Sequence, residues 1–574
     1  MNTKKIERRN EKMISNAYFQ NLYSLLTDPS LWDANHFIVM NHEAGTGKSR
    51  NAQEIFAEIA TTTSHRILYV IKFKRNNEMK NIVSHINNLA HDKVAFGLDS
   101  DTKKSRKKWN EALNSKVLVI THSMYKRISQ GLYPELMENR QILVIDEKPN
   151  LTTKCSVELM EIGGIVSSLY GILSANRQLL SDLKMMVESL TEKFWYYQHQ
   201  STANAIMTPF YIVPTEQAHM LQLLEKIEKV IKGHPNSLFF DTNQDALVRL
   251  RTILRHPSMV SQSEIFTFSE TLPFVKMECN VILDANASMD PYYTMSDDFI
   301  LQRQPKVLDF SGNRLIHYDL NTSKTGLSKN QDAEIAAFKS LDWSVFSNVL
   351  VVTDLNRENI VRKLAAEITR IEGRKGHAMR VEVTHFGNLI GVNRYRTFDT
   401  AILLKTPFLS NESYGLDYLH FSVLKNQPVL PFTYQQLIEI KNSAVAGEMY
   451  QALARINRDH NLLANYIVFT ANAEALKLVR QQMQNIHFET RAMSIHTSSS
   501  KQHKVSKTKQ GKLGLLKLLS GYMRKGFKEI DKRRLRDDLG LQGFEFSRVL
   551  KEASKELKRM GVGITRYKLE FQSP

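Results

Sequence analysis

The chain has 574 residues, of which 42% are hydrophobic and 24% are charged. This composition excludes a wholly disordered protein, and the length predicts about three or four domains. Its two cysteines, Cys155 and Cys279, exclude a disulfide framework, a zinc ribbon and a four-cysteine iron–sulfur site.

The formal net charge of +18 is concentrated at the C-terminus. Residues 501–574 carry 20 Lys or Arg against 8 Asp or Glu, which is two thirds of the excess. A basic segment of this size favours nucleic acid as a partner, and the alternative is a solvated basic surface.

No run of residues reaches the about 20 apolar positions that a membrane span needs. The basic N-terminal residues are not followed by the apolar segment of a secretory signal. We therefore expect a cytoplasmic protein with no membrane partner.

Short runs rich in Val and Ile predict buried strands of a parallel sheet after a helical lead-in over residues 1–34. These runs lie at 36–40, 66–73, 116–123 and 141–147, and the sheet is expected to resume at 264–275 and 280–288. Between them, about 150–265 has Leu, Met, Lys and Glu at helical spacing and predicts a mainly helical insertion.

A second strand–helix series follows at 348–364, 378–387, 399–407 and 465–471. The predicted fold is therefore α/β, with two RecA-like doubly wound parallel-sheet domains. We place the first domain at 35–299 and the second at 300–493. A Ser-, Lys- and Gln-rich linker at 494–512 leads to a basic domain at 513–574.

A glycine loop between a predicted strand and a predicted helix indicates a phosphate-binding site. Its sequence is HEAGTGKS, from His42 to Ser49, with His42 in place of the usual first glycine. Glycines let backbone N–H groups close around phosphate, and the helix N-terminus faces the same anion. The predicted nucleotide-binding residues are Ala44, Gly45, Thr46, Gly47, Lys48 and Ser49.

The run QILVI ends in Asp146 and Glu147, which supply the acidic groups that ATP hydrolysis requires. We expect Asp146 and the Ser49 hydroxyl to hold Mg²⁺, and Glu147 to orient and deprotonate the attacking water. The predicted ligands are thus ATP and Mg²⁺.

The glycine loop and the sequence DEKP at 146–149 resemble motifs I and II of superfamily-two helicases, the DEAD/DEAH-like group. VILDANAS at 281–288 is similar to motif III, with Asn286 in place of threonine, and 385–407 resembles motif V in helicases of bacterial and phage mobile elements. YQALARINR at 450–458 resembles motif VI. The resemblance implies that Gln451, Arg455 and Arg458 are catalytic and that the two arginines reach the γ-phosphate across the interdomain cleft.

The same resemblance implies contacts with the nucleic-acid backbone from the first domain and from the motif V loop. The expected residues are Lys72, Thr121 and Arg394, although lysines that follow a strand are often merely solvated. The insertion could guide the strand or bind a protein partner, and its sequence does not choose between them.

The C-terminal segment predicts three helices, at 511–526, 533–541 and 544–561, and a hairpin-like end in which 564–571 alternates like a strand. This order suggests a winged helix-turn-helix in which Arg548, Lys551 and Lys555 of the third helix contact DNA. A solvated helix face or a protein–protein module are the alternatives.

Together these features predict an ATP-dependent nucleic-acid helicase or translocase acting in replication, recombination or defence, with DNA preferred over RNA. Two other functions fit the same residues. One is a nucleotide-switched replication initiator or loader. The other is a DNA-binding protein with a degenerate nucleotide site. His42 and Asn286 favour it, and the intact Lys48, Asp146, Glu147 and Arg458 oppose it.

Overall fold

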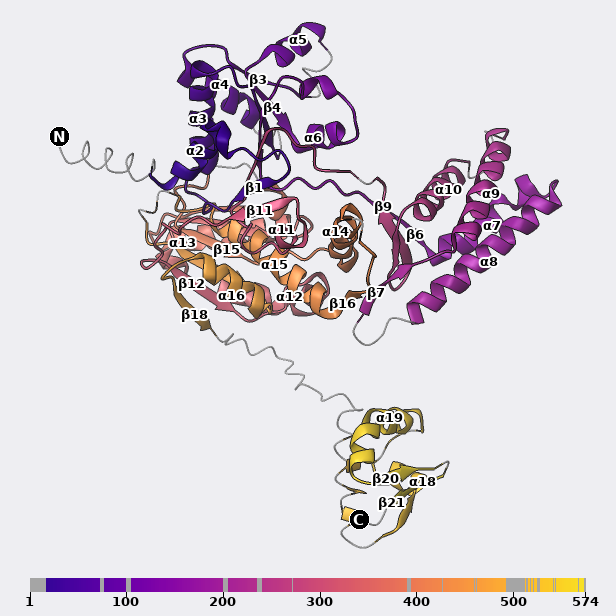
Figure 1. Ribbon diagram of the computed structural model, residues 1–574. Coiled ribbons are helices and arrows are strands. Elements are labelled where there is room, and N and C mark those ends of the chain that lie inside the picture. The colour runs from indigo at the N-terminus through magenta and orange to yellow at the C-terminus, as the bar shows by residue number, and fades with distance from the viewer. Residues whose placement is uncertain are drawn as a thin grey trace. The chain divides into compact units, whose positions relative to one another are not determined.

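The chain divides into two compact units, Met1–Met493 and Ser494–Pro574, which are described separately (Figure 1). The computed structural model describes residues 17–72, 77–99, 105–199, 205–234, 240–270, 272–389, 394–425, 427–458, 460 and 462–491. In the C-terminal unit it describes 512, 515–516, 518–519, 521–523, 527–539, 541, 543–565 and 567–571. Gly391 and Asn393 of the motif V-like loop and the predicted linker up to residue 511 lie outside these ranges.

The first lobe of the N-terminal unit is built on a seven-stranded sheet in the order β11-β1-β10-β5-β2-β4-β3, and every pairing in it is parallel. Its strands are β1 (Phe37–Met40), β2 (Ile67–Ile71), β3 (Ala95–Gly97), β4 (Val117–Thr121), β5 (Ile142–Asp146), β10 (Cys279–Leu283) and β11 (Phe299–Gln302). Its helices are α2 (Gln20–Thr27), α3 (Lys48–Thr62), α4 (Glu78–Ala90), α5 (Arg106–Asn114), α6 (His122–Ser129) and the short α11 (Tyr292–Met295).

The second lobe has a six-stranded parallel sheet in the order β14-β13-β15-β17-β12-β18. Its strands are β12 (Arg314–Tyr318), β13 (Asn348–Thr353), β14 (Arg380–His385), β15 (Thr400–Leu403), β17 (Asn465–Phe469) and β18 (His487–Arg491). Its helices are α12 (Lys324–Lys339), α13 (Glu358–Arg374), α14 (Asn411–Leu424), α15 (Tyr434–Leu453) and α16 (Ala473–Gln482).

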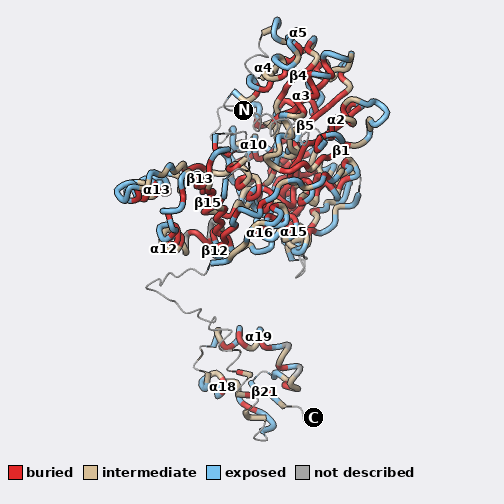
Figure 2. The backbone as a smooth tube through the Cα atoms, turned by 90° about the vertical axis from the view of Figure 1, so that its left-hand side faces the viewer, coloured by how far each residue is buried: buried red, intermediate tan, exposed pale blue. Residues whose placement is uncertain are grey.

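These two sheets confirm the predicted α/β fold with two RecA-like doubly wound domains. The central strands are apolar along their whole length because both faces of each sheet are covered, and Figure 2 shows buried residues along them. One boundary differs from the expectation, since β11 joins the edge of the first sheet although residues from 300 onward were assigned to the second domain. The second sheet begins at Arg314.

The insertion is mainly helical, and it also carries a small sheet of its own. It contains β6 (Lys154–Glu158), α7 (Leu159–Leu173), α8 (Arg177–His199), β7 (Ala205–Phe210), α9 (Pro214–Lys232), α10 (Phe240–Arg255), β8 (Ser258–Val260) and β9 (Glu264–Phe268). Its pairings are antiparallel, so the run 264–275, expected to resume the first sheet, instead belongs to the insertion. Strands of three to six residues give too short a pattern to show which sheet they join.

A segment of the second lobe completes the insertion's sheet. Strand β16 (Phe432–Thr433), far along the chain, pairs with β7 at its edge, opposite Met207. Helix α14, which precedes β16, packs beside it, and its Gly415 leaves room for the Met207 sulfur: a Cβ there would lie 2.5 Å from Sδ. We call residues 408–433 the strap.

In the C-terminal unit, β19 (Glu529–Asp531), β21 (Lys568–Phe571) and β20 (Val562–Ile564) form an antiparallel sheet beside α18 (Lys532–Asp538) and α19 (Gly543–Arg559). The apolar stripe of α19 is buried as predicted, with Val549, Ala553 and Leu557 fully covered. The hairpin-like end expected there is formed by β20 and β21, which pair antiparallel, and the Thr565 hydroxyl donates to the Lys568 carbonyl between them. The predicted helix at 511–526 falls partly outside the described residues.

Among the residues that the structure describes, no helix is both long and apolar enough to cross a membrane.

Candidate active site

The glycine loop lies where a phosphate-binding loop needs to lie, between the end of β1 and the start of α3. Gly45 and Gly47 have φ angles of +91° and +89°, which side chains other than glycine rarely adopt. Lys48 is the first residue of α3. The free N–H groups of this helix start, together with Lys48, form an anion-binding site.

His42 and Glu43, which precede the glycines, hold the loop in place through contacts on its buried side. The His42 ring is fully buried, with its centroid 5.0 Å from that of Tyr18 and 4.7 Å from that of Phe19. Burial lowers the pKa of His42 to about 4, so the ring is neutral at physiological pH. The Glu43 carboxylate accepts hydrogen bonds from the backbone N–H of Val307 (2.6 Å) and Leu308 (3.0 Å), in the segment that joins the two lobes. His42 therefore replaces glycine as a packed core residue, and the loop keeps its shape.

Asp146 lies beside the loop because β5 ends at the same edge of the sheet as β1. The Ser49 hydroxyl donates to Asp146 Oδ2 at 2.8 Å, and the Tyr69 hydroxyl donates to the same oxygen at 3.2 Å. Burial raises the pKa of Asp146, while Lys48 acts to lower it. The hydroxyl and carboxylate oxygens side by side are the donors that Mg²⁺ prefers, and Mg²⁺ sites complete themselves with substrate phosphates and water. These residues fit the predicted metal.

Glu147 adopts a left-handed backbone, with φ of +65°, and its N–H donates to the carbonyl of Leu283 at the end of β10. Its carboxylate accepts a hydrogen bond from Lys72 Nζ at 2.8 Å. Burial by itself would raise the pKa of Glu147, but Lys72 and Lys48 outweigh it and lower that pKa to about 2. Glu147 is thus ionised at neutral pH.

Two arginines from the second lobe lie against this acidic and glycine-rich edge. A Cβ built on Gly45 would lie 4.0 Å from Arg458 Cγ, so Arg458 packs beside the glycine loop. Burial and the neighbouring Arg455 lower the pKa of Arg458 to about 10. Arg455 interacts electrostatically with Glu147 and Asp146, and its buried Nε donates no hydrogen bond. An unpaired buried guanidinium N–H next to a phosphate loop fits an incoming anion.

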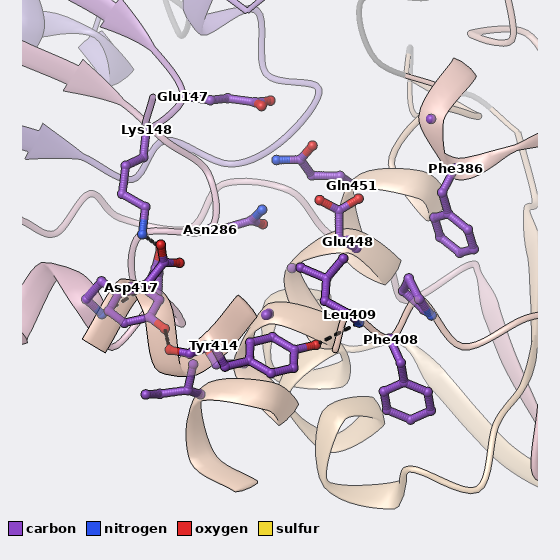
Figure 3. A pocket seen from close by; sticks show the side chains of 18 of the residues that line it. Glu147, Lys148, Asn286, Phe386, Phe408, Leu409, Tyr414, Asp417, Glu448 and Gln451 are labelled. Carbon is purple, nitrogen blue, oxygen red and sulfur yellow. Dashed lines mark hydrogen bonds and ion pairs between the residues drawn. The ribbon is translucent and has the colours of Figure 1, made fainter. Parts of the chain in front are cut away.

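Gln451 and Asn286 line a cavity of about 540 Å³ between the lobes, together with Glu147 and Lys72 (Figure 3). Asn286 contacts α15 closely, since a Cβ on Gly447 would lie 3.1 Å from Asn286 Nδ2. The motif III-like residue therefore touches the helix that leads to Gln451 and the arginines. The predicted residues Gly45, Lys48, Ser49, Asp146, Glu147, Arg455 and Arg458 thus gather in one interlobe site, with Gln451 at the adjoining cavity.

The expected nucleic-acid contacts are distributed differently. Lys72 is paired with Glu147 inside the cleft instead of facing a free surface. The Thr121 hydroxyl caps α6 by accepting from the Met124 N–H at 3.3 Å. Arg394 forms an ion pair with Glu382, Nε to Oε2 at 3.3 Å, with most of its side chain exposed. In α19, Arg548 and Lys551 are exposed, whereas the side chain of Lys555 lies outside the described residues.

Two further side chains, His122 and Lys148, lie beside the acidic pair in contacts that the sequence did not predict. His122 contacts the Asp146 carbonyl oxygen at 3.0 Å through Nε2, and burial lowers its pKa to about 4. Lys148 Nζ forms an ion pair with Asp290 at 2.6 Å and lies 4.3 Å from the ring centroid of Tyr292. For Lys148, its place directly after the acidic pair was the only available hint.

No protein-family model matches the chain, and no curated protein matches it in sequence. Solved structures of similar shape include Xpd4 of S. tokodaii, at 11% identity and a TM-score of 0.44, covering 79% of this chain and 96% of that one. An XPD helicase shows 11% identity and a TM-score of 0.43, covering 84% and 99%. Dbp5 of S. cerevisiae, bound to RNA and ADP BeF3, shows 11% identity and a TM-score of 0.34, covering 80% and 86%. Because these identities and scores are low, the chemistry of the site has to be judged from its own side chains.

Proposed function

We propose that the protein is an ATP-dependent nucleic-acid translocase or helicase of the superfamily-two type, which moves on DNA in preference to RNA. The observation that carries this proposal is the meeting of two lobes at one site. The first lobe supplies the glycine loop, Asp146 and Glu147, and the second supplies Arg455 and Arg458. A site divided between two bodies can convert nucleotide turnover into relative motion of those bodies.

Each side chain of the site can be assigned a role in the hydrolysis of ATP. Lys48 and the N–H groups of the loop bind the β- and γ-phosphates. Glu147 accepts a proton from the attacking water, whose oxygen bonds to the γ-phosphorus. The bond from that phosphorus to the β–γ bridging oxygen breaks, which yields ADP and inorganic phosphate.

The arginines stabilise the negative charge that builds on the phosphoryl oxygens and on the leaving ADP. When bound, Mg²⁺ held by Ser49 and Asp146 would neutralise charge on the same phosphates. Since Arg455 and Arg458 belong to the second lobe, their contribution requires a closed cleft. Hydrolysis and release of phosphate remove the group that both lobes bind, which favours opening.

The basic C-terminal unit is proposed to hold DNA through the exposed face of α19, where Arg548 and Lys551 project. Replacing both with glutamate should weaken binding of duplex DNA in a salt-dependent manner. Each lost phosphate contact should lower the slope of log affinity against log salt by about 0.9. An unchanged slope would contradict this role and favour a protein-binding module.

The test of the main proposal is steady-state ATP hydrolysis with Mg²⁺, with and without single-stranded DNA, for the native chain and Lys48→Ala. Hydrolysis that DNA stimulates and that Lys48→Ala abolishes is the expected result. DNA binding without hydrolysis in either protein would overturn the motor and leave a scaffold with a silent nucleotide site. Strand displacement on a tailed duplex then separates a helicase from a replication initiator or loader that does not unwind.

A further inference from the structure

Lys72 has a partner that its position did not predict. It directly follows β2, at the carboxyl edge of the first sheet, and its Nζ donates to Glu147 Oε2 at 2.8 Å. The side chain of Lys72 is 28% exposed and that of Glu147 is 17% exposed, and both line the cavity between the lobes. The pair is therefore accessible from the cavity side.

Three cations act on the Glu147 carboxylate, and they differ in where they lie. Lys48 belongs to the phosphate loop, and Arg455 lies close to Asp146 as well as to Glu147. Nucleotide phosphates would engage both. Lys72 alone among the three is a lining residue of the interlobe cavity. When ATP is bound, Lys48 and Arg455 would contact its phosphates, and Lys72 would remain the cation that is paired with the Glu147 carboxylate.

An ammonium group hydrogen-bonded to a carboxylate covers one of the two oxygens that could accept a proton from water. Glu147 so paired is held back from general-base catalysis. A lysine is a compact point charge on a flexible stem, and it binds a phosphate as readily as a carboxylate. An anion entering the cavity can therefore compete for Lys72.

We propose that Lys72 is a latch on the catalytic base, which a backbone phosphate of bound single-stranded nucleic acid draws away from Glu147 so that hydrolysis begins only on the strand. This inference rests on the proposed ATPase. It assigns regulation to the same site, and it combines the expected nucleic-acid contact of Lys72 with its observed ion pair. The shared ligand chemistry is the phosphodiester, in DNA or RNA.

Lys72 differs from its neighbours at this edge and in the cavity. The register of β2 with β4 pairs Ile71 with Thr121, so the residue after each strand, Lys72 and His122, lies at the same edge. The other two lysines of the cavity are paired with acids that have no role in hydrolysis, Lys148 with Asp290 and Lys405 with Asp354. Lys72 is the lysine of this cavity whose release would change the chemistry.

The test measures ATP hydrolysis by the full chain with and without oligothymidylate, and in parallel with oligouridylate to separate DNA from RNA. Lys72→Met keeps the aliphatic stem and removes the charge. We expect its rate without oligonucleotide to rise roughly fivefold or more, as for ordinary coupling between two sites. Its ratio of stimulated to unstimulated rate should fall close to one. Lys72→Arg, which keeps a cation, should restore a low unstimulated rate.

Lys405→Met is the matched control, because it removes a paired lysine from the same cavity without touching Glu147. Its unstimulated rate and its stimulation should stay at native values. A Lys72→Met protein that loses hydrolysis equally with and without oligonucleotide would overturn the latch and make Lys72 a positioning residue for Glu147. Full stimulation from a low unstimulated rate in Lys72→Met would also overturn it. No hydrolysis by the native chain under any condition would contradict the proposed function itself, and the latch with it.

Discussion

The two parallel sheets of the N-terminal unit present their carboxyl edges to the same cavity, and these edges carry different chemistry. In the first sheet, the strand ends are followed by a glycine loop, Lys72 and the Asp146–Glu147 pair. In the second sheet, β13 is followed by Asp354, which forms an ion pair with Lys405 at 3.5 Å. One architecture thus supplies a phosphate site in one lobe and arginines from the turn after α15 in the other, because function resides in the loops that the fold presents.

The largest expected effect tests whether the second lobe takes part in hydrolysis at all. Arg458→Ala should lower kcat for ATP hydrolysis by about 10³-fold or more, since a guanidinium facing the transferred phosphoryl group is typically worth that much. The KM for ATP should change far less. Steady-state kinetics provides the measurement. If kcat of Arg458→Ala stays within a few-fold of the native kcat, the second lobe takes no part in hydrolysis.

The matching change in the first lobe is Glu147→Gln. It should lower kcat by about 10²- to 10⁴-fold, because it removes the general base while leaving a side chain of nearly the same size. Binding of a fluorescent ATP analogue should persist, since Lys48 and the loop remain. Loss of nucleotide binding together with hydrolysis would show that Glu147 supports the loop and does not act as the base.

Through the strap, the second lobe contributes side chains to the core of the insertion. A substitution at Gly415 tests this packing. Gly415→Val should destabilise the N-terminal unit by about 1–3 kcal/mol, the usual result of adding atoms to a filled core, because Met207 and Phe266 occupy the space. Gly163→Val in α7 is the control, because nothing lies within 4 Å of its Cβ position. Denaturant unfolding that gives equal losses for both variants would mean that only helix propensity was changed.

The smallest effect concerns Asp417 in the strap, which is only partly exposed and accepts a hydrogen bond from the Thr152 hydroxyl at 3.3 Å. Burial raises its pKa from 3.8 to about 6, although Lys148 acts to lower it. The folded state then binds the proton more tightly than the unfolded state, so this group's contribution to stability falls as pH rises from about 4 to about 6, by at most about 3 kcal/mol. Asp417→Asn should flatten that part of the stability profile. An identical pH profile for both proteins would show that Asp417 titrates normally.

Much of the catalytic site could be predicted from the sequence, because its residues follow strands that continuous apolar runs identify. Lys48, Ser49, Asp146 and Glu147 follow β1 and β5, and parallel strands bring such positions to one edge. The prediction of Arg455 and Arg458 rested only on their spacing and on a family resemblance. Their position opposite Gly45 depends on how the lobes pack, which local patterns do not encode.

The rest could not be predicted because it depends on pairings between distant segments. The sequence near residue 432 gives no indication that Phe432 lies opposite Met207, since a two-residue strand has no periodicity. The Lys72 ammonium had two possible partners, a phosphate and a carboxylate, and only the three-dimensional arrangement identifies Glu147. Strands β3, β11, β12 and β18 were also missed, because they lie at edges or lack a continuous apolar run.

The pairing of β16 with β7 also bears on how the chain folds as it is synthesised. Strand β7 ends at Phe210, whereas β16 begins at Phe432, so the ribosome must add more than 200 residues before the insertion's sheet receives its edge strand. At elongation speeds of about 5–20 residues per second, that delay is roughly 10–45 s. During this interval the apolar side chains of β7 and β8 face no partner from the strap. The nascent insertion is therefore the part of the molecule that chaperones would have most reason to protect.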